Sequence, residues 1–153
     1  LASQREERIT ALTRTRKHRE LLHDLLARWH PALPAEPQLG QVLRAACAVL
    51  PLSAAVVRDD RGNVVAGSSD EAVTRLVPTE VLDPEGPAFA GHLPAQGGRI
   101  AIQAGAHRTA WLDAWGDGRD AGLESRRAVA DVARLIGILL AGSGYAASAR
   151  ARP

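Results

Sequence analysis

Two tryptophans, an arginine and a glutamine have a spacing that could gather them on one face of a β-sheet. Residues 99–104 and 109–115 have the alternating pattern of strands, in which successive side chains point to opposite faces. Trp111 and Trp115 then share a face of the second strand, and Arg99 and Gln103 share a face of the first. Large apolar surface with a few polar groups is typical of small-molecule sites. These four residues, with His92 from the loop-rich segment 68–98, are the predicted ligand-binding set.

The choice of sheet face decides this prediction. If Ile100, Ile102 and Leu112 pack against helices, the tryptophan face is left to the loops and is free to bind a ligand. A shift of one residue in register would instead turn both tryptophans into the core. With the predicted faces, Arg99 slightly favours an acidic ligand.

The other reactive residue types are not arranged for catalysis. The five histidines are scattered, and the sequence has no HxxxH, HExxH or CxxC pair to hold a metal. Ser68 and Ser143 do not lie in a nucleophile elbow, and no phosphate-binding glycine motif is present. Cys47 lies within a helical stretch, away from a helix N-terminus that would lower its pKa. Asp59 and Asp60 fit a turn. We therefore expect a non-enzymatic domain without a cofactor or metal.

Composition limits the class of protein. With 153 residues, of which 46% are hydrophobic, the chain is expected to form one domain with a single core. The formal net charge is only +2, so little supports a nucleic-acid partner for this segment. A lone Cys47 indicates a buried thiol in a reducing compartment. No run approaches the roughly 18 apolar residues of a membrane span, so we expect a cytoplasmic protein that does not enter a membrane.

Helical periodicity appears in three segments. Residues 3–30 predict one helix, whose charged first half has only a thin apolar stripe and is expected to project as a stalk. Residues 39–50 predict a second helix. Residues 123–140 predict the last helix, which has the cleanest apolar stripe and Gly142 as its expected stop.

Strand patterns lie between the helices. Short β-branched runs at 54–59 and 63–66 flank the turn Asp60-Arg-Gly-Asn and predict a hairpin. Residues 72–77 predict a short helix and residues 88–92 a short edge strand, followed by the strands 99–104 and 109–115. The fold class is therefore α+β, with an antiparallel sheet of about five strands and the N-terminal, second and C-terminal helices on one face.

Several stretches together resemble a known family. They are Arg-Glu-Leu-Leu-His-Asp-Leu-Leu-Ala at 19–27, the second helix ending in Val-Leu-Pro, the strand-turn-strand unit at 55–66, Thr-Ala-Trp-Leu at 109–112 and the Ala/Leu-rich last helix. This order resembles the GAF-like sensory domain, in particular the version ahead of the helix-turn-helix in PucR/CdaR-type transcriptional regulators. The short middle third departs from the fuller GAF pattern and argues against a large enclosed cavity.

The resemblance implies a function and a domain plan. It implies a non-enzymatic small-molecule-sensing and dimerisation module of a cytoplasmic transcriptional regulator, which contacts DNA only through a domain outside this chain. The alternative is a protein–protein interaction scaffold with a degenerate GAF-like pocket in another signalling protein. Residues 1–30 would form the stalk helix, 31–142 the sensory domain on which that helix packs, and 143–153 a flexible linker. A homodimer through helical surfaces is expected, and deletion of residues 1–18 should weaken it.

Overall fold

The computed structural model describes residues 16–17, 19–50, 52–83, 93, 96–104, 107–117 and 124–143. Helical turns at residues 16–17 and 19–28 come first. The elements that follow are α2 (Ala35–Val49), β1 (Leu52–Asp59), β2 (Val64–Gly67), the 3-10 turn η1 (Ala72–Thr74), β3 (Gly98–Ala104), β4 (His107–Gly116) and α3 (Glu124–Ser143). The α+β class is confirmed. The helices predicted at 39–50 and 123–140 and the strands predicted at 54–59, 63–66, 99–104 and 109–115 lie within a few residues of their expected bounds. The projecting first half of the helix predicted at 3–30 falls mostly outside the described residues.

The strands form one antiparallel sheet in the order β2-β1-β4-β3. Within the described residues this sheet has four strands, where about five were predicted. A single parallel bridge extends it, because Val81 pairs with Arg99 on the free edge of β3. There Arg99 N donates to Glu80 O at 2.9 Å and Leu82 N donates to Arg99 O at 2.7 Å. The edge strand predicted at 88–92 lies outside the described residues.

The hairpin between β1 and β2 confirms the turn predicted at residues 60–63. Gly62 takes a φ of +88°, which glycine adopts without the steric cost that a Cβ brings. One carboxylate oxygen of Asp59 accepts the backbone N–H groups of Arg61 and Asn63, each at 2.9 Å. Asp59 therefore has the turn role expected of it.

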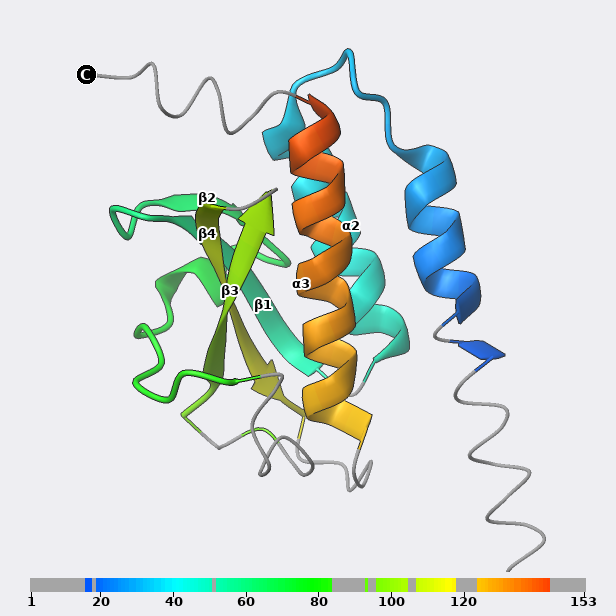
Figure 1. The fold of residues 1–153 in the computed structure, drawn as a ribbon. Helices are drawn as coiled ribbons and strands as arrows, with labels where there is room; N and C mark the ends of the chain where they lie inside the picture. The colour runs from blue at the N-terminus through cyan, green and yellow to red at the C-terminus, as the bar shows by residue number, and fades with distance from the viewer. Residues whose placement is uncertain are drawn as a thin grey trace, which may run out of the picture.

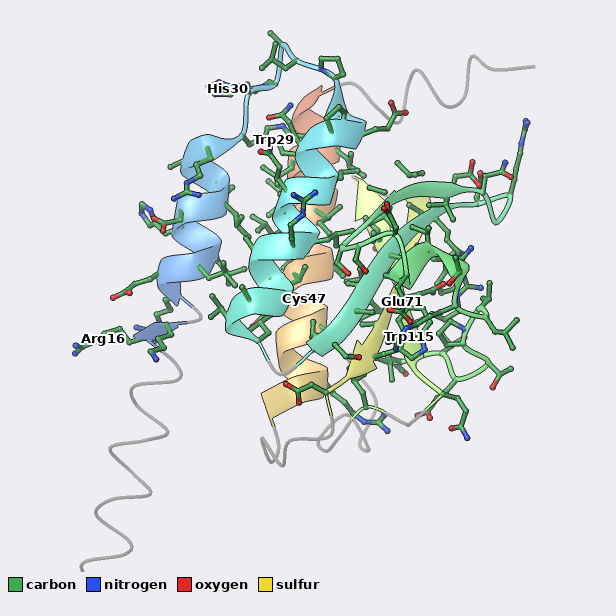
Figure 2. All side chains as sticks on the ribbon, turned by 180° about the vertical axis from the view of Figure 1, so that it is seen from behind. Arg16, Trp29, His30, Cys47, Glu71 and Trp115 are labelled. Atoms are coloured by element: carbon green, nitrogen blue, oxygen red, sulfur yellow. The ribbon has the colours of Figure 1, made fainter. Side chains whose placement is uncertain are left out.

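In the described part of the chain, the α-helices lie on one face of the sheet (Figure 1). α3 packs on β3, and α2 packs on β1 and β2. The N-terminal helix was predicted on the same face, but both views place α2 and α3 between it and the sheet (Figures 1 and 2). The two inner helices already cover the sheet, so the N-terminal helix adds its buried residues to the outside of the same core, namely Leu21, Leu25 and Trp29.

Two predicted boundaries were wrong. The helix expected at 72–77 is a single 3-10 turn that ends at Thr74. Ser69 Oγ accepts the N–H of Ala72 at 3.1 Å, as expected of a helix start, but the backbone is already extended at Arg75 (ψ 148°), ahead of Pro78. At the other end of the chain, α3 continues through Gly142 to Ser143. Gly142 lacks the positive φ of a helix-ending glycine.

Candidate functional site

The predicted assignment of the two sheet faces is confirmed. Ile100, Ile102, Leu112 and Ala114 belong to the main core beneath the helices. The opposite face, here called the distal face, carries the side chains that alternate with them. Strand pairing aligns these side chains across the sheet. Between β3 and β4, Arg99 pairs with Asp113 and Ala101 pairs with Trp111. Between β1 and β4, Arg58 pairs with Trp111. The members of the distal face are Ala54, Val56, Arg58, Arg99, Ala101, Trp111, Asp113 and Trp115.

A buried carboxylate organises the centre of the distal face. Asp113 is fully buried, and its two oxygens accept hydrogen bonds from Arg58 Nε at 2.9 Å and Arg99 Nε at 3.0 Å. Arg58 also donates to the carbonyl oxygen of Arg75 at 3.2 Å. Burial raises the pKa of the Asp113 carboxyl, and the charges and hydrogen bonds of the two guanidinium groups oppose that rise. One carboxylate thus pairs with two arginines but balances the charge of only one, which leaves a surplus positive charge on this face.

Trp111 and Trp115 have different surroundings, although they share the distal face. The guanidinium carbon of Arg99 lies 4.5 Å from the ring centre of Trp111, in the range of a cation–π contact, and Trp111 is partly exposed. Trp115 is buried in a second apolar cluster with Ala54, Val56 and Ala72, and its indole N–H donates to Gln96 O at 3.1 Å. The chain's own residues therefore fill the space around Trp115.

Close packing against Trp115 explains why residue 97 is a glycine. Gly97 has a φ of +85°, and a Cβ there would lie 2.5 Å from Nε1 of Trp115. We expect Gly97→Ala to combine left-handed strain of about 1–2 kcal/mol with an overpacking cost of about 1–3 kcal/mol. Gly62→Ala is the matched control, because Gly62 has a similar φ and a Cβ there would meet nothing within 4 Å. Urea unfolding of both variants measures the difference, and equal losses would refute the ring contact.

A groove of about 770 Å³ runs along the free edge of β3. Its volume lies within the range of small-molecule sites. Trp111, Ala101 and Gln103 reach it from strands β4 and β3 of the sheet. The loop before β3 and helix α3 form the remaining walls. The other lining residues are Val81, Leu82, Asp83, Ile100, Ala130, Ala133 and Arg134.

The structure separates the five predicted site residues. Trp111 and Gln103 line the groove. Arg99 stacks on Trp111 and pairs with Asp113, while Trp115 lies in the second cluster (Figure 2). His92 lies outside the described residues. The sequence reasoning missed Arg134, because its contribution depends on how α3 passes the sheet edge, and it missed the pairing role of Asp113, which its position on the same strand face as the tryptophans could have indicated.

Cys47 is half-buried on α2 (Figure 2), less enclosed than expected. Burial raises the pKa of its thiol, and a hydrogen bond with Ser68 partly offsets this. Because the thiolate is the nucleophile, native Cys47 should react with iodoacetamide more slowly than the urea-unfolded chain at pH 8. The native rate should keep rising above about pH 8.5, where a free cysteine is half ionised. A native thiol as reactive as the unfolded one would argue against this environment.

The described part of the chain offers neither a cluster of metal ligands nor a membrane-spanning helix. There, no group of three or more His, Cys, Asp or Glu side chains is arranged to hold a metal ion. Among the same residues, no helix combines the length and apolar character of a membrane span.

Comparison with known proteins bears on the fold. No protein-family model and no curated protein matches this sequence. Among solved structures, the GAF domain of a proposed sensor histidine kinase from Pseudomonas syringae pv. tomato matches over 100% of both chains, with a TM-score of 0.57 and 18% identity. The chain has a GAF-like fold. At 18% identity, the similarity shows a shared arrangement of helices and strands.

Proposed function

We propose that this GAF-like domain is a non-enzymatic small-molecule-sensing and dimerisation module of a cytoplasmic transcriptional regulator of the PucR/CdaR type. DNA would be contacted only by a domain outside this chain. The observation that carries the sensing role is the groove at the β3 edge, which joins the distal face to helix α3. A ligand there would touch both the sheet and a helix that could pass a signal onward.

The chemistry of the groove supports binding rather than conversion. Its lining combines one aromatic ring, several aliphatic side chains and the polar ends of Gln103, Asp83 and Arg134. Such a mixture holds and orients a small molecule. The described cysteine, Cys47, is not placed to attack a ligand in this groove. Burial raises the pKa of its thiol, and it lies on α2, away from the groove.

The packing around Trp115 favours a second candidate. A GAF-like domain whose pocket has closed would serve as a protein–protein interaction scaffold in another signalling protein. The buried cluster of Trp115 with Ala54, Val56 and Ala72 fills half of the predicted site, which fits this alternative. The other half of the predicted site, the groove beside Trp111, is open and fits the sensing role.

A thermal-shift screen separates the two candidates. We expect at least one compound among metabolites, nucleotides and purine intermediates to raise the melting temperature, because a ligand that binds only the folded state stabilises it by mass action. The same compound should fail to stabilise Trp111→Ala. If no compound in a broad screen shifts the melting temperature, the scaffold becomes the better account.

The homodimer belongs to the same proposal. The apolar stripe of α3 is largely buried within the chain. Among the described residues, the exposed large apolar side chains on helices are Leu26 on the N-terminal helix, Val49 at the end of α2 and Ile138 on α3, 47%, 43% and 58% exposed. Leu26 and Ile138 are the most exposed of these and are the candidates for a helical interface. We expect a dimer mass by light scattering at high micromolar concentration, and a monomer mass for the Leu26→Lys/Ile138→Lys double variant. Leu76→Lys, a still more exposed apolar position that is not on a helix, is the control. A monomer mass for the unaltered chain counts against dimerisation, and deletion of residues 1–18 should weaken the dimer.

A further inference from the structure

The charges around the groove are not balanced. Arg134 is an exposed residue of α3 that lines the groove. Behind Trp111, Arg99 shares the single carboxylate of Asp113 with Arg58. The acidic residue among the described lining residues is Asp83. Two positive charges, that of Arg134 and the surplus of the Arg58–Asp113–Arg99 cluster, thus face one negative charge, and the groove favours an anion.

The apolar surface of the groove is suited to a flat body. Trp111 presents an indole ring that is partly exposed, and Val81 is 58% exposed on the loop. Ala130 and Ala133 on α3 are small, so the helix wall is low where it passes these side chains. An aromatic or alicyclic ring could lie between the Trp111 indole and this wall, where stacking and apolar burial both contribute.

From these observations we infer that the groove binds a small organic anion with a flat apolar body, and that Arg134 is the residue that receives its carboxylate. Gln103 lies at the same groove and can donate its side-chain N–H to the second carboxylate oxygen. A guanidinium pairs with a carboxylate through charge-assisted hydrogen bonds, which are stronger than neutral ones. This inference rests on the proposed sensing function and names the chemical class of its ligand.

Arg134 would also couple the ligand to α3. The loop at the groove is fixed on two sides, because Glu80 pairs with Arg126 of α3 at 3.1 Å and the backbone of Glu80 and Leu82 bonds to Arg99 of β3. The loop therefore bridges the sheet edge and the helix. An anion held by Arg134 adds a second link between α3 and the sheet face, and its binding should stabilise the position of α3 against β3.

The test uses naphthoate and its uncharged amide, naphthamide, as a matched pair of probes for the full chain. Isothermal titration calorimetry should give about tenfold tighter binding of naphthoate than of naphthamide, as expected for a charge-assisted contact. Arg134→Gln should remove this preference and leave naphthamide binding unchanged. Arg44→Gln, an exposed arginine on α2 that does not line the groove, should keep the full preference. Thermal unfolding confirms that each variant is folded, since both arginines are exposed.

The possible outcomes separate the two proposals. If both probes bind the unaltered chain equally, the anion preference is wrong while a ligand site remains. If the preference persists in Arg134→Gln, another residue receives the carboxylate and the assignment of Arg134 is overturned. If neither probe binds although a compound from the metabolite screen raises the melting temperature, this inference is wrong while the sensing role remains. If neither probe binds and no compound in the screen raises the melting temperature, both proposals are wrong.

Discussion

Replacing Asp113 by alanine is expected to lower the free energy of unfolding by about 3–5 kcal/mol. The carboxylate is fully buried and holds both Arg58 and Arg99. Arg58 is itself buried, and a guanidinium cannot lose its proton in a protein. Without Asp113 it would keep a charge in the interior with only a carbonyl oxygen as partner. The ion cluster as a whole adds little to the free energy of unfolding compared with apolar residues of similar volume. Removing one partner is costly, because it leaves a buried charge without compensation.

Glu71→Ala is the matched control for this prediction. Glu71 also pairs with an arginine of the distal side, Arg75, at 2.9 Å, but its side chain is 65% exposed. Exposed ion pairs contribute about 0–1 kcal/mol. Chemical denaturation of the two variants compares a buried and an exposed carboxylate in the same fold. Equal losses would show that Asp113 is not the buried centre of an ion cluster.

The two tryptophans of the distal face should respond differently to truncation. Trp115→Ala removes the largest member of the second apolar cluster and is expected to cost about 3–5 kcal/mol. Trp111 is partly exposed and stacks on Arg99, so Trp111→Ala should cost about 1–2 kcal/mol. Naphthoate binding should be lost in Trp111→Ala.

Urea unfolding monitored by circular dichroism measures both losses, and calorimetry measures binding. Trp115→Phe serves as a control, because it keeps an aromatic ring in the cluster while it loses the N–H bond to Gln96 O and part of the buried ring volume. A larger stability loss at Trp111 than at Trp115 would reverse the roles assigned here and leave Trp111 as a core residue.

The sheet faces could be predicted from the sequence because strand alternation fixes them. Ile100, Ile102 and Leu112 recur every second residue, which places them together whatever the rest of the fold does. The hairpin was equally local, since Gly62 and Asp59 set its turn within five residues. These two predictions depend on residues that are close in the sequence, and both agree with the structure.

The site residues whose surroundings differ from expectation depend on contacts between distant elements. Arg99 was assigned to a ligand, but its partner Asp113 is 14 residues away and is brought to it by the pairing of β3 with β4. Trp115 was assigned to the same pocket as Trp111, yet η1 and Gly97 close over it. The sequence pattern indicates which face a side chain occupies, whereas the loops that cover each part of that face depend on tertiary packing.

The most direct test of the account is fluorine NMR of the chain labelled with fluorotryptophan. The chain has three tryptophans, and they lie in three environments: Trp29 in the helical layer, Trp115 in the second cluster and Trp111 at the groove. Trp111→Phe assigns the groove signal by its disappearance. On titration with naphthoate, the Trp111 resonance should move and saturate while the Trp29 and Trp115 resonances stay in place. A Trp111 signal that does not move, or a shift confined to Trp29 or Trp115, would contradict a ligand site in this groove.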